Sequence, residues 1–387
     1  MALMNDRFTV LAHPFRIFFL SSAIMAAVLI PLWIYLLTNG LSAQLALPPL
    51  IWHQHEMLAA FLYPAIAGFL LTAVCNWTGT PPPARSHLLM LWLVWLAGRL
   101  AMGFGQDFEV MAAIVDLAFM PLVACFFGLK VWRAKQKRQI ILVCGVCLFW
   151  LLDLGFHITH QARFFHAQIL LAGALILVVG GRITPAFTNN WLRQHAPHVP
   201  QIVSHERLDR IGLIMAVSLV LAQAMFAQLS PLGAVMALGA GVVTLARLWQ
   251  WRLYWVRHEP LLWVLQLGQL WVAIGYLLFA CTALGWLPAN VWLHALGAGA
   301  MGTMILGVMT RVSMGHTGRA LKLPSGGVWI YILVTAAVLV RLAAALNWIA
   351  LPFGWWLAAV LWSLAFGLFL LRYSAILMAP RPDGRAG

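Results

Sequence analysis

Twelve runs of mostly apolar residues, each long enough to cross a lipid bilayer as one helix, follow one another along this 387-residue sequence. A spanning helix needs about 20 such residues. Only 9% of the residues are charged, whereas soluble domains average about 25%, so one soluble core could not bury this much apolar surface. We therefore predict an all-α integral membrane protein that forms a single polytopic domain over residues 1–387. The predicted spans are 16–37, 55–74, 87–105, 108–129, 139–157, 163–180, 210–228, 232–250, 260–281, 290–309, 327–346 and 351–373.

The lysines and arginines alternate between loops on the two sides of the predicted bilayer. With a cytoplasmic N-terminus, all but three of the 24 basic residues fall on the cytoplasmic side, as the positive-inside rule requires. The exceptions are Arg99, Arg163 and Arg341. We therefore expect both the N and C termini in the cytoplasm. This topology also explains the net charge of +14 without a nucleic-acid partner.

The segment 52–57, Trp-His-Gln-His-Glu-Met, places two histidines and a carboxylate at the mouth of an apolar run. Ionisable groups inside a membrane are rare and usually functional, and neutral imidazole is a common ligand of haem iron and copper. On one helix, His53 and His55 would point about 200° apart, so both could not face one metal. If the helix begins between them, one can bind a metal while the other caps the helix or binds a second centre. Glu56 is placed to accept a hydrogen bond from a metal-bound imidazole; the alternative is an interfacial histidine pair bonded to loop carbonyls.

Four further histidines fall on the predicted outer side. His157, His160 and His166 bracket the turn between the fifth and sixth spans, where they are candidate copper ligands; an exposed polar turn explains them equally well. His294 begins a span rich in glycine and alanine. Such a face allows the close approach of a neighbouring helix, and equally of a flat macrocycle.

Acids and arginines add to the same outer end. Glu56, Asp116 and Asp153 are acids that the predicted spans place there. Arg99 and Arg341 each lie at the end of an apolar span, against the positive-inside bias. Haem propionates near an outer surface would attract these arginines through charge-assisted hydrogen bonds, and ordinary snorkelling of the side chains is the alternative.

Two further patterns concern the architecture. Histidine-initiated spans recur at every fourth helix, in the second, sixth and tenth spans, which is consistent with a pseudo-threefold 4+4+4 arrangement. On the inner side, the segments 180–185 and 309–319 are dense in polar and turn residues, and they predict an anion site or a closure of the cytoplasmic face. Residues 181–209 are predicted to form the long inner loop.

Several long motifs resemble the NnrS family, in the same order and over nearly the whole chain. They are Pro-Phe-Arg-Ile-Phe-Phe-Leu at 14–20, the motif at 52–57, Gly-Phe-Leu-Leu-Thr-Ala-Val at 68–74, Asn-Trp-Thr-Gly at 76–79, Gly-Gly-Arg-Ile-Thr-Pro-Ala-Phe-Thr at 180–188, and the segment 294–319. The resemblance implies a twelve-helix protein of the bacterial inner (cytoplasmic) membrane that carries haem, of the b type, and copper. It also implies a role in nitric oxide metabolism and resistance to nitrosative stress, with nitric oxide or a related small molecule and an electron donor as partners.

The outer-side histidines of the second, sixth and tenth spans are also similar to those of the haem–copper oxidase catalytic subunit. There the second and tenth spans bind a haem, and the sixth contributes to copper. Carried over, this similarity implies His55 or His53, together with His294, as haem ligands, and His166 as a copper ligand. The tenth span has one histidine where the oxidases have two, and the seventh lacks their copper-binding pair, so a full centre of two haems and copper is not expected. Gln266 stands where the NnrS pattern usually has a histidine.

We therefore hypothesise a haem- and copper-binding inner-membrane protein of the NnrS type; whether it catalyses a redox reaction of nitric oxide stays open. A metal-free secondary transporter is the second hypothesis, and it predicts inverted repeats and broken helices near the midplane. The third hypothesis is a delivery factor that binds haem or copper only transiently. The polar residues gather toward the outer end instead of the midplane, which favours the first hypothesis over the transporter.

Overall fold

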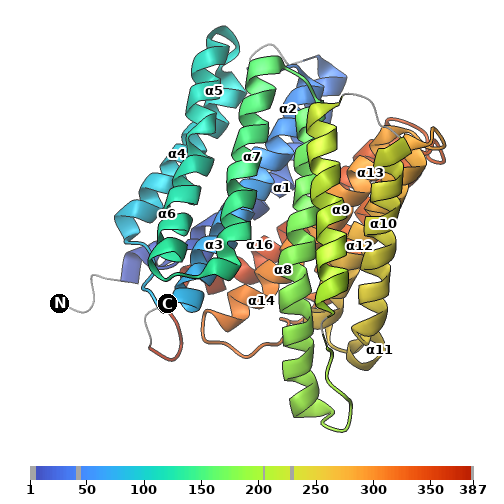
Figure 1. Ribbon diagram of the computed structural model, residues 1–387. Helices are drawn as coiled ribbons and strands as arrows, with labels where there is room; N and C mark the ends of the chain where they lie inside the picture. Colours follow the sequence, from blue (N-terminus) through green and yellow to red (C-terminus); the bar gives the residue numbers. More distant parts are fainter. Residues whose placement is uncertain (1–5, 41–44, 204, 227–230, 385–387) are drawn as a thin grey trace. The chain divides into compact units, whose positions relative to one another are not determined.

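In the computed structural model, which describes residues 6–40, 45–203, 205–226 and 231–384, every regular element is a helix (Figure 1). Twelve helical segments of this described part are long and apolar enough to cross a membrane. The predicted all-α, twelve-span membrane fold is therefore confirmed, and each predicted span overlaps one of these segments. The cytoplasmic location of the termini, the 4+4+4 arrangement and the single-domain organisation stay predictions.

The helices follow the apolar runs of the sequence, in most cases with extra residues at one or both ends. The spanning segments are Pro14–Asn39 (α1), Pro49–Thr78, Arg85–Phe104 (α4), Gln106–Arg133, Lys137–Thr159, Arg163–His195 (α8), Glu206–Met225 (α9), Pro231–Gln250 (α10), Pro260–Ala283 (α12), Ala289–Gly315, Val328–Ala345 (α15) and Phe353–Met378 (α16). Several segments contain more than one helix: Pro49–Glu56 (α2), Met57–Leu62 (η2) and Tyr63–Thr78 (α3); Gln106–Phe108 (η3), Glu109–Leu117 (α5) and Phe119–Arg133 (α6); Lys137–Gln139 (η4) and Ile140–Thr159 (α7); and Ala289–His294 (α13), Ala295–Gly302 (η5) and Thr303–Gly315 (α14). A short helix, Asp6–Leu11 (η1), precedes the first span, and another, Leu253–Val256 (α11), lies between α10 and α12.

Helix α8 is longer than predicted. The predicted loop 181–209 is wrong over its first part, because α8 continues to His195. Gly180 and Gly181 do not end the helix, and Pro185 lies inside it. The segment 309–319 is likewise helical over its first part, since α14 ends at Gly315.

The paired glycines of α8 serve close packing and not a turn. Gln269 of α12 donates a hydrogen bond from Nε2 to the carbonyl of Ile176 (2.7 Å), and Arg247 of α10 donates from Nη2 to the carbonyl of Leu177 (3.2 Å). A Cβ on either glycine would collide with these two polar side chains. Arg247 is also ion-paired with Asp209, with 2.7 Å between Nε and Oδ1. The glycines therefore admit buried polar groups that reach across the surface of α8.

The chain divides into two compact units. The first unit comprises Met1–Phe165, Met309–Gly327 and Trp362–Gly387, and the second comprises His166–Val308 and Val328–Leu361. In the second unit, α12 packs on α10, α13 and η5, while α15 packs on α13 and η5.

The central element of the first unit is the segment Pro49–Thr78. Of its most apolar stretch, 89% is buried, against 33% for the corresponding stretches of α4 and of the segment Lys137–Thr159. Helix α1 packs on η2 and α3, α3 packs on α6, and α4 packs on α5. The polar residues of α2 therefore begin the most deeply buried segment of this unit.

The wide helical turn η2 has a cause in the sequence. Pro64 lacks the N–H that an ordinary helical bond would use, and the N–H of Tyr63 bonds to the carbonyl of Leu58, five residues back. The carbonyl of Ala59 accepts a hydrogen bond from Trp95 Nε1 (2.9 Å). Wide turns of this π type often occur at functional sites. This one begins directly after α2.

The second wide turn, η5, directly follows His294 and consists almost entirely of small residues. A Cβ at Gly299 would lie 2.8 Å from the ring of Trp271, so glycine lets η5 approach α12 closely. At Gly297, no atom lies within 4 Å of the position that a Cβ would take. Each unit therefore has one wide turn that follows a short helix bearing histidine.

Candidate metal centre

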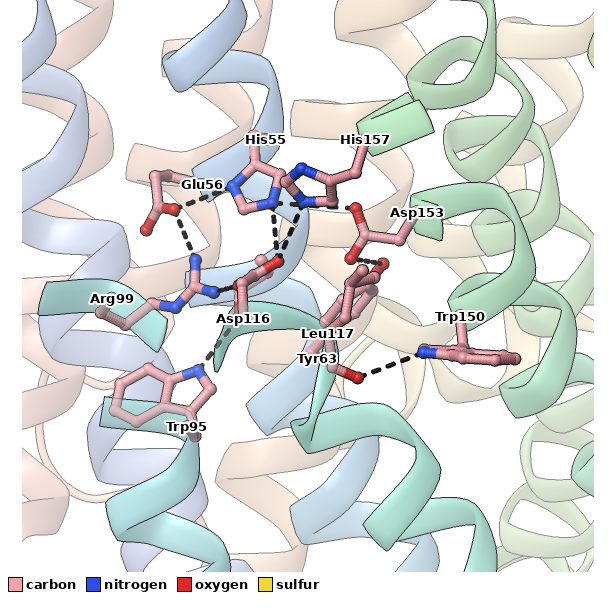
Figure 2. A network of polar contacts seen from close by, with 11 residues as sticks. His55, Glu56, Tyr63, Trp95, Arg99, Asp116, Leu117, Trp150, Asp153 and His157 are labelled. Carbon is pink, nitrogen blue, oxygen red and sulfur yellow. Dashed lines mark hydrogen bonds and ion pairs between the residues drawn. The ribbon is translucent and has the colours of Figure 1, made fainter. Parts of the chain in front are cut away.

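Four membrane-spanning segments of the first unit bring six ionisable side chains together, and Figure 2 shows how they point toward one another. We call this group the buried cluster. Its members are His55 and Glu56 of α2, Arg99 of α4, Asp116 of α5, and Asp153 and His157 of α7. Their side chains are only 1–6% exposed. His55, Arg99 and Asp153 sit five or six residues from an end of their helix, which corresponds to about 8–9 Å along the axis.

His55 has carboxylate partners on both sides of its ring. Its Nδ1 lies 2.9 Å from Glu56 Oε1, and its Nε2 lies 3.0 Å from Asp116 Oδ2. Asp153 Oδ1 is 3.7 Å from the same Nε2. A neutral imidazole carries one proton, so it can donate to only one of these sides at a time.

His157 approaches the same point from α7. Its Nε2 lies 3.4 Å from Asp116 Oδ2, and its ring meets the ring of His55 edge to face at 5.5 Å between centroids. Asp153 precedes it by four residues, so both side chains lie on one face of α7. Two turns of one helix thus supply an imidazole and a carboxylate to the cluster.

Arg99 bridges two of the carboxylates. Its Nη1 pairs with Glu56 Oε1 and its Nη2 with Asp116 Oδ1, both as close ion pairs. The neighbouring Gly98 makes this possible, because a Cβ there would lie 3.1 Å from the Cα of Asp116. Glycine therefore lets α4 and α5 approach closely enough for the bridge.

The cluster carries an excess of negative charge. With neutral histidines, three carboxylates and one guanidinium leave two negative charges in a buried site inside the membrane-spanning helices. Tyr63 adds a neutral hydrogen bond from its hydroxyl to Asp153 Oδ2 (3.4 Å). Buried charges are costly unless they are paired or bind a metal.

Four members of the cluster can hold a metal ion together. One ligand atom from each of His55, Asp116, Asp153 and His157 lies within 4.8 Å of every other. Glu56 and Arg99 surround this set of four. Glu56 contacts the other ring nitrogen of His55, Nδ1, and Arg99 contacts the other carboxylate oxygen of Asp116, Oδ1. Without a metal, the same atoms can share protons.

The other two histidines that the sequence assigns to this end of the first unit point elsewhere. His53 stacks on Trp33, with ring centroids 4.2 Å apart and planes 19° apart. Both His53 and His55 lie within α2, so the expected divergence holds and His55 is the one that faces the cluster. His160 is 58% exposed, and its Nδ1 lies 3.5 Å from Oε1 of Glu109, which is 48% exposed.

The remaining sequence-predicted residues belong to the second unit. His166 meets the ring of Trp292 edge to face, with centroids 5.8 Å apart. His294 Nδ1 lies 2.6 Å from the carbonyl oxygen of Asn290. On α15, Arg341 Nη1 is buried and has no hydrogen-bond partner among the described residues. Helix α15 packs on α13, which carries His294.

Gln266, which replaces an expected histidine, is buried in α12 and donates a hydrogen bond to the carbonyl of Trp251 (3.4 Å).

The structure also adds residues that sequence reasoning did not assign to a site. The sequence places Asp116 and Asp153 at the same end of the spans as His55 but gives them no role in a site, and nothing in the sequence singles out Tyr63. Acids at the same depth in neighbouring spans form the pattern that could have identified the two aspartates as members of one cluster.

Comparison with known families gives a match over nearly the whole chain. The family model described as NnrS protein covers residues 9–381 of the chain. A search of curated proteins finds no match.

Proposed function

Because the chain belongs to the NnrS family, we propose that it is a haem- and copper-binding protein of the bacterial inner membrane that handles nitric oxide or a related small molecule and contributes to resistance to nitrosative stress. The observation that carries this proposal is the buried cluster. Six ionisable side chains are gathered inside a multi-pass membrane protein, where such groups are rare and usually functional. Two of them are imidazoles, which suit both haem iron and copper.

For the haem, His294 and Arg341 fit better than the residues of the buried cluster. A carbonyl can only accept, so the contact with Asn290 puts the proton of His294 on Nδ1 and the lone pair on Nε2. In this state His294 would hold a haem iron through Nε2, while the hydrogen bond on Nδ1 would fix the orientation of its ring. The buried Nη1 of Arg341, without a hydrogen-bond partner in the described chain, suits a propionate carboxylate.

His55 fits a haem poorly, because both of its ring nitrogens already face carboxylates. Arg99 fits a propionate poorly for a similar reason, since Glu56 and Asp116 occupy its guanidinium. A haem at this point would have to displace the aspartates. We therefore assign the haem to the second unit and the second metal to the buried cluster of the first.

For copper, we propose His55 and His157 with Asp116 and Asp153, whose ligand atoms lie together. Nitrogen and oxygen donors accept Cu²⁺. His160 is exposed beside Glu109 and has no part in this set.

When bound, ferrous haem supplies an iron that binds nitric oxide directly, and copper supplies a second redox-active metal. The chain itself orients the ligating imidazoles and keeps water from them.

A reduced-minus-oxidised spectrum and metal analysis on purified protein test this proposal. We expect a haem spectrum that shifts when nitric oxide is added to the reduced protein. His294→Ala should remove most of the haem, whereas His195→Ala, on the exposed end of α8, should keep it. A colourless, metal-free protein that stays folded would overturn the proposal and favour a metal-free transporter.

A further inference from the structure

We infer that the buried cluster selects a divalent cation, such as Cu²⁺, Zn²⁺ or Fe²⁺, over Cu⁺ and holds it in a four-coordinate site of two imidazoles and two carboxylates. This inference rests on the proposed second-metal site and names the class of ion that the site takes. The ligands are His55, His157, Asp116 and Asp153.

Three of the six separations between ligand atoms lie close to the edges of a tetrahedral site, and all four ligand atoms lie within 4.8 Å of one another. His55 Nε2 is 3.0 Å from Asp116 Oδ2 and 3.7 Å from Asp153 Oδ1, and His157 Nε2 is 3.4 Å from Asp116 Oδ2. A tetrahedron with metal–ligand bonds of about 2.0–2.1 Å has edges of about 3.3–3.4 Å. The observed distances lie on both sides of this value, so small side-chain shifts suffice to receive the ion.

The hydrogen bonding of His55 leaves a place for a cation. Glu56 Oε1 and Asp116 Oδ2 can only accept, and they lie on opposite nitrogens of the ring. Whichever nitrogen carries the single proton of a neutral ring, the other directs its lone pair at a carboxylate oxygen. This repulsion disappears when a cation sits between Nε2 and the two aspartates. Glu56 then has the role of the carboxylate that accepts from the far nitrogen of a metal-bound histidine.

Charge decides between ions. The cluster holds two excess negative charges when its histidines are neutral, and Arg99 already pairs with Glu56 and Asp116. A divalent cation neutralises the site, whereas Cu⁺ leaves one negative charge buried, which is costly. The donor atoms also favour a divalent cation, because Cu⁺ prefers thiolate and thioether sulfur and the four ligands offer no sulfur.

The test uses the full-length chain without an affinity tag, purified in detergent and stripped of metal with a chelator. Samples receive Zn²⁺, Fe²⁺ without oxygen, or Cu⁺ under ascorbate, and an equimolar mixture of Zn²⁺ and Cu⁺. Bound metal per chain is measured by mass spectrometry after desalting. We expect the unsubstituted protein to retain one more equivalent of Zn²⁺ or Fe²⁺ than His157→Gln, and to prefer Zn²⁺ in the mixture. His160→Gln, at the exposed end of α7, should behave as the unsubstituted protein.

A charge variant makes the test sharper. Asp153→Asn removes one negative charge while keeping the shape of the side chain, so the preference for Zn²⁺ over Cu⁺ should fall about tenfold or more. If His157→Gln fails to fold, Glu56→Gln replaces it, with an expected loss of about 10–100-fold in Zn²⁺ affinity.

The outcomes separate this inference from the proposed function. A protein that takes Cu⁺ as readily as Zn²⁺, or whose preference is unchanged by Asp153→Asn, overturns the inference and leaves a copper protein. A protein that binds no metal at the cluster overturns the inference and the second-metal assignment together. Haem is scored separately in each sample by its absorbance.

Discussion

Arg99 supplies the positive charge that pairs with Glu56 and Asp116 inside the buried cluster. Removal of one partner from a buried ion pair leaves the other charges uncompensated in a medium of low polarity. Arg99→Gln is therefore expected to lower the free energy of unfolding by about 3–5 kcal/mol. The midpoint of thermal unfolding in detergent measures the change, with Arg372→Gln, an exposed arginine of α16, as the control. Equal midpoints for the two variants would show that Arg99 is not a structural counter-ion.

A second group of basic residues lies at the start of α1, also in the first unit. Arg16 is fully buried and donates hydrogen bonds to the carbonyls of Leu377 (2.6 Å) and Ala379 (2.8 Å). The rings of His13 and His316 both lie near the ring of Phe15, with centroid distances of 6.0 and 5.7 Å. Burial, together with the charges of His316, Arg16 and Arg381, lowers the pKa of His13 from 6.5 to about 4. The pKa of His316 is also lowered by burial and by Arg381.

These histidines predict a loss of stability in acid. A folded-state pKa below the ordinary value means that the unfolded chain binds the proton more readily. The contribution of neutral His13 is therefore fully present above about pH 6.5 and is lost as the pH falls toward 4. Unfolding midpoints between pH 7.5 and 4.5 should fall less steeply for His13→Gln than for the unsubstituted protein. The exposed His258→Gln should follow the unsubstituted curve, and an unchanged slope for His13→Gln would contradict the assignment.

The residues of the site were predictable to different degrees. Glu56, Asp116 and Asp153 were placed at one end of their spans because counting along apolar runs gives their depth. The choice between His53 and His55 was left open, since it depends on where α2 begins and on the ring of Trp33. The partners of Arg99 could not be predicted from its own span. They depend on how closely α4 approaches α5, which is a property of the packed helices.

At the scale of elements, that close approach rests on Gly98. A Cβ at this position would lie 3.1 Å from the Cα of Asp116, which is backbone and cannot rotate away. Gly98→Ala is therefore expected to separate α4 from α5, destabilise the protein by about 1–3 kcal/mol and weaken metal binding at the cluster. Gly103, on the same helix, is the matched control, because no atom lies within 4 Å of its Cβ position. Gly103→Ala should be neutral or stabilise by up to about 1 kcal/mol; equal effects at both glycines would refute the packing argument.

The elements themselves were mostly predictable, because a bilayer demands about 20 apolar residues per span whatever the fold. The error lay in α8, where Gly180 and Gly181 suggested a turn. Glycine is equally suited to a turn and to a helix that another side chain must cross. Only the positions of Gln269 and Arg247, about 70 to 90 residues further along the chain, distinguish the two.

For the whole molecule, each proposed site draws its ligands from a single unit. His55, Asp116, Asp153 and His157 belong to the first unit, and His294 to the second. We therefore expect each site to load without the other. His157→Gln should lose the bound metal ion and keep its haem, and His294→Ala should do the reverse, as measured by absorbance and metal content of one preparation. Loss of both groups from a well-folded single variant would mean that the two sites depend on each other.

The wide turn η2 determines how this protein responds to the deletion of one residue. Each residue rotates an α-helix by about 100°. The wide turn η2 contains one residue more than an ordinary helical turn, and this extra residue sets the rotational position of α2 relative to α3. Deletion of one residue from Met57–Leu62 would return the segment to the ordinary period and swing His55 away from Asp116. A loss of one codon that touches no ligand would then disable the centre as completely as the loss of a ligand.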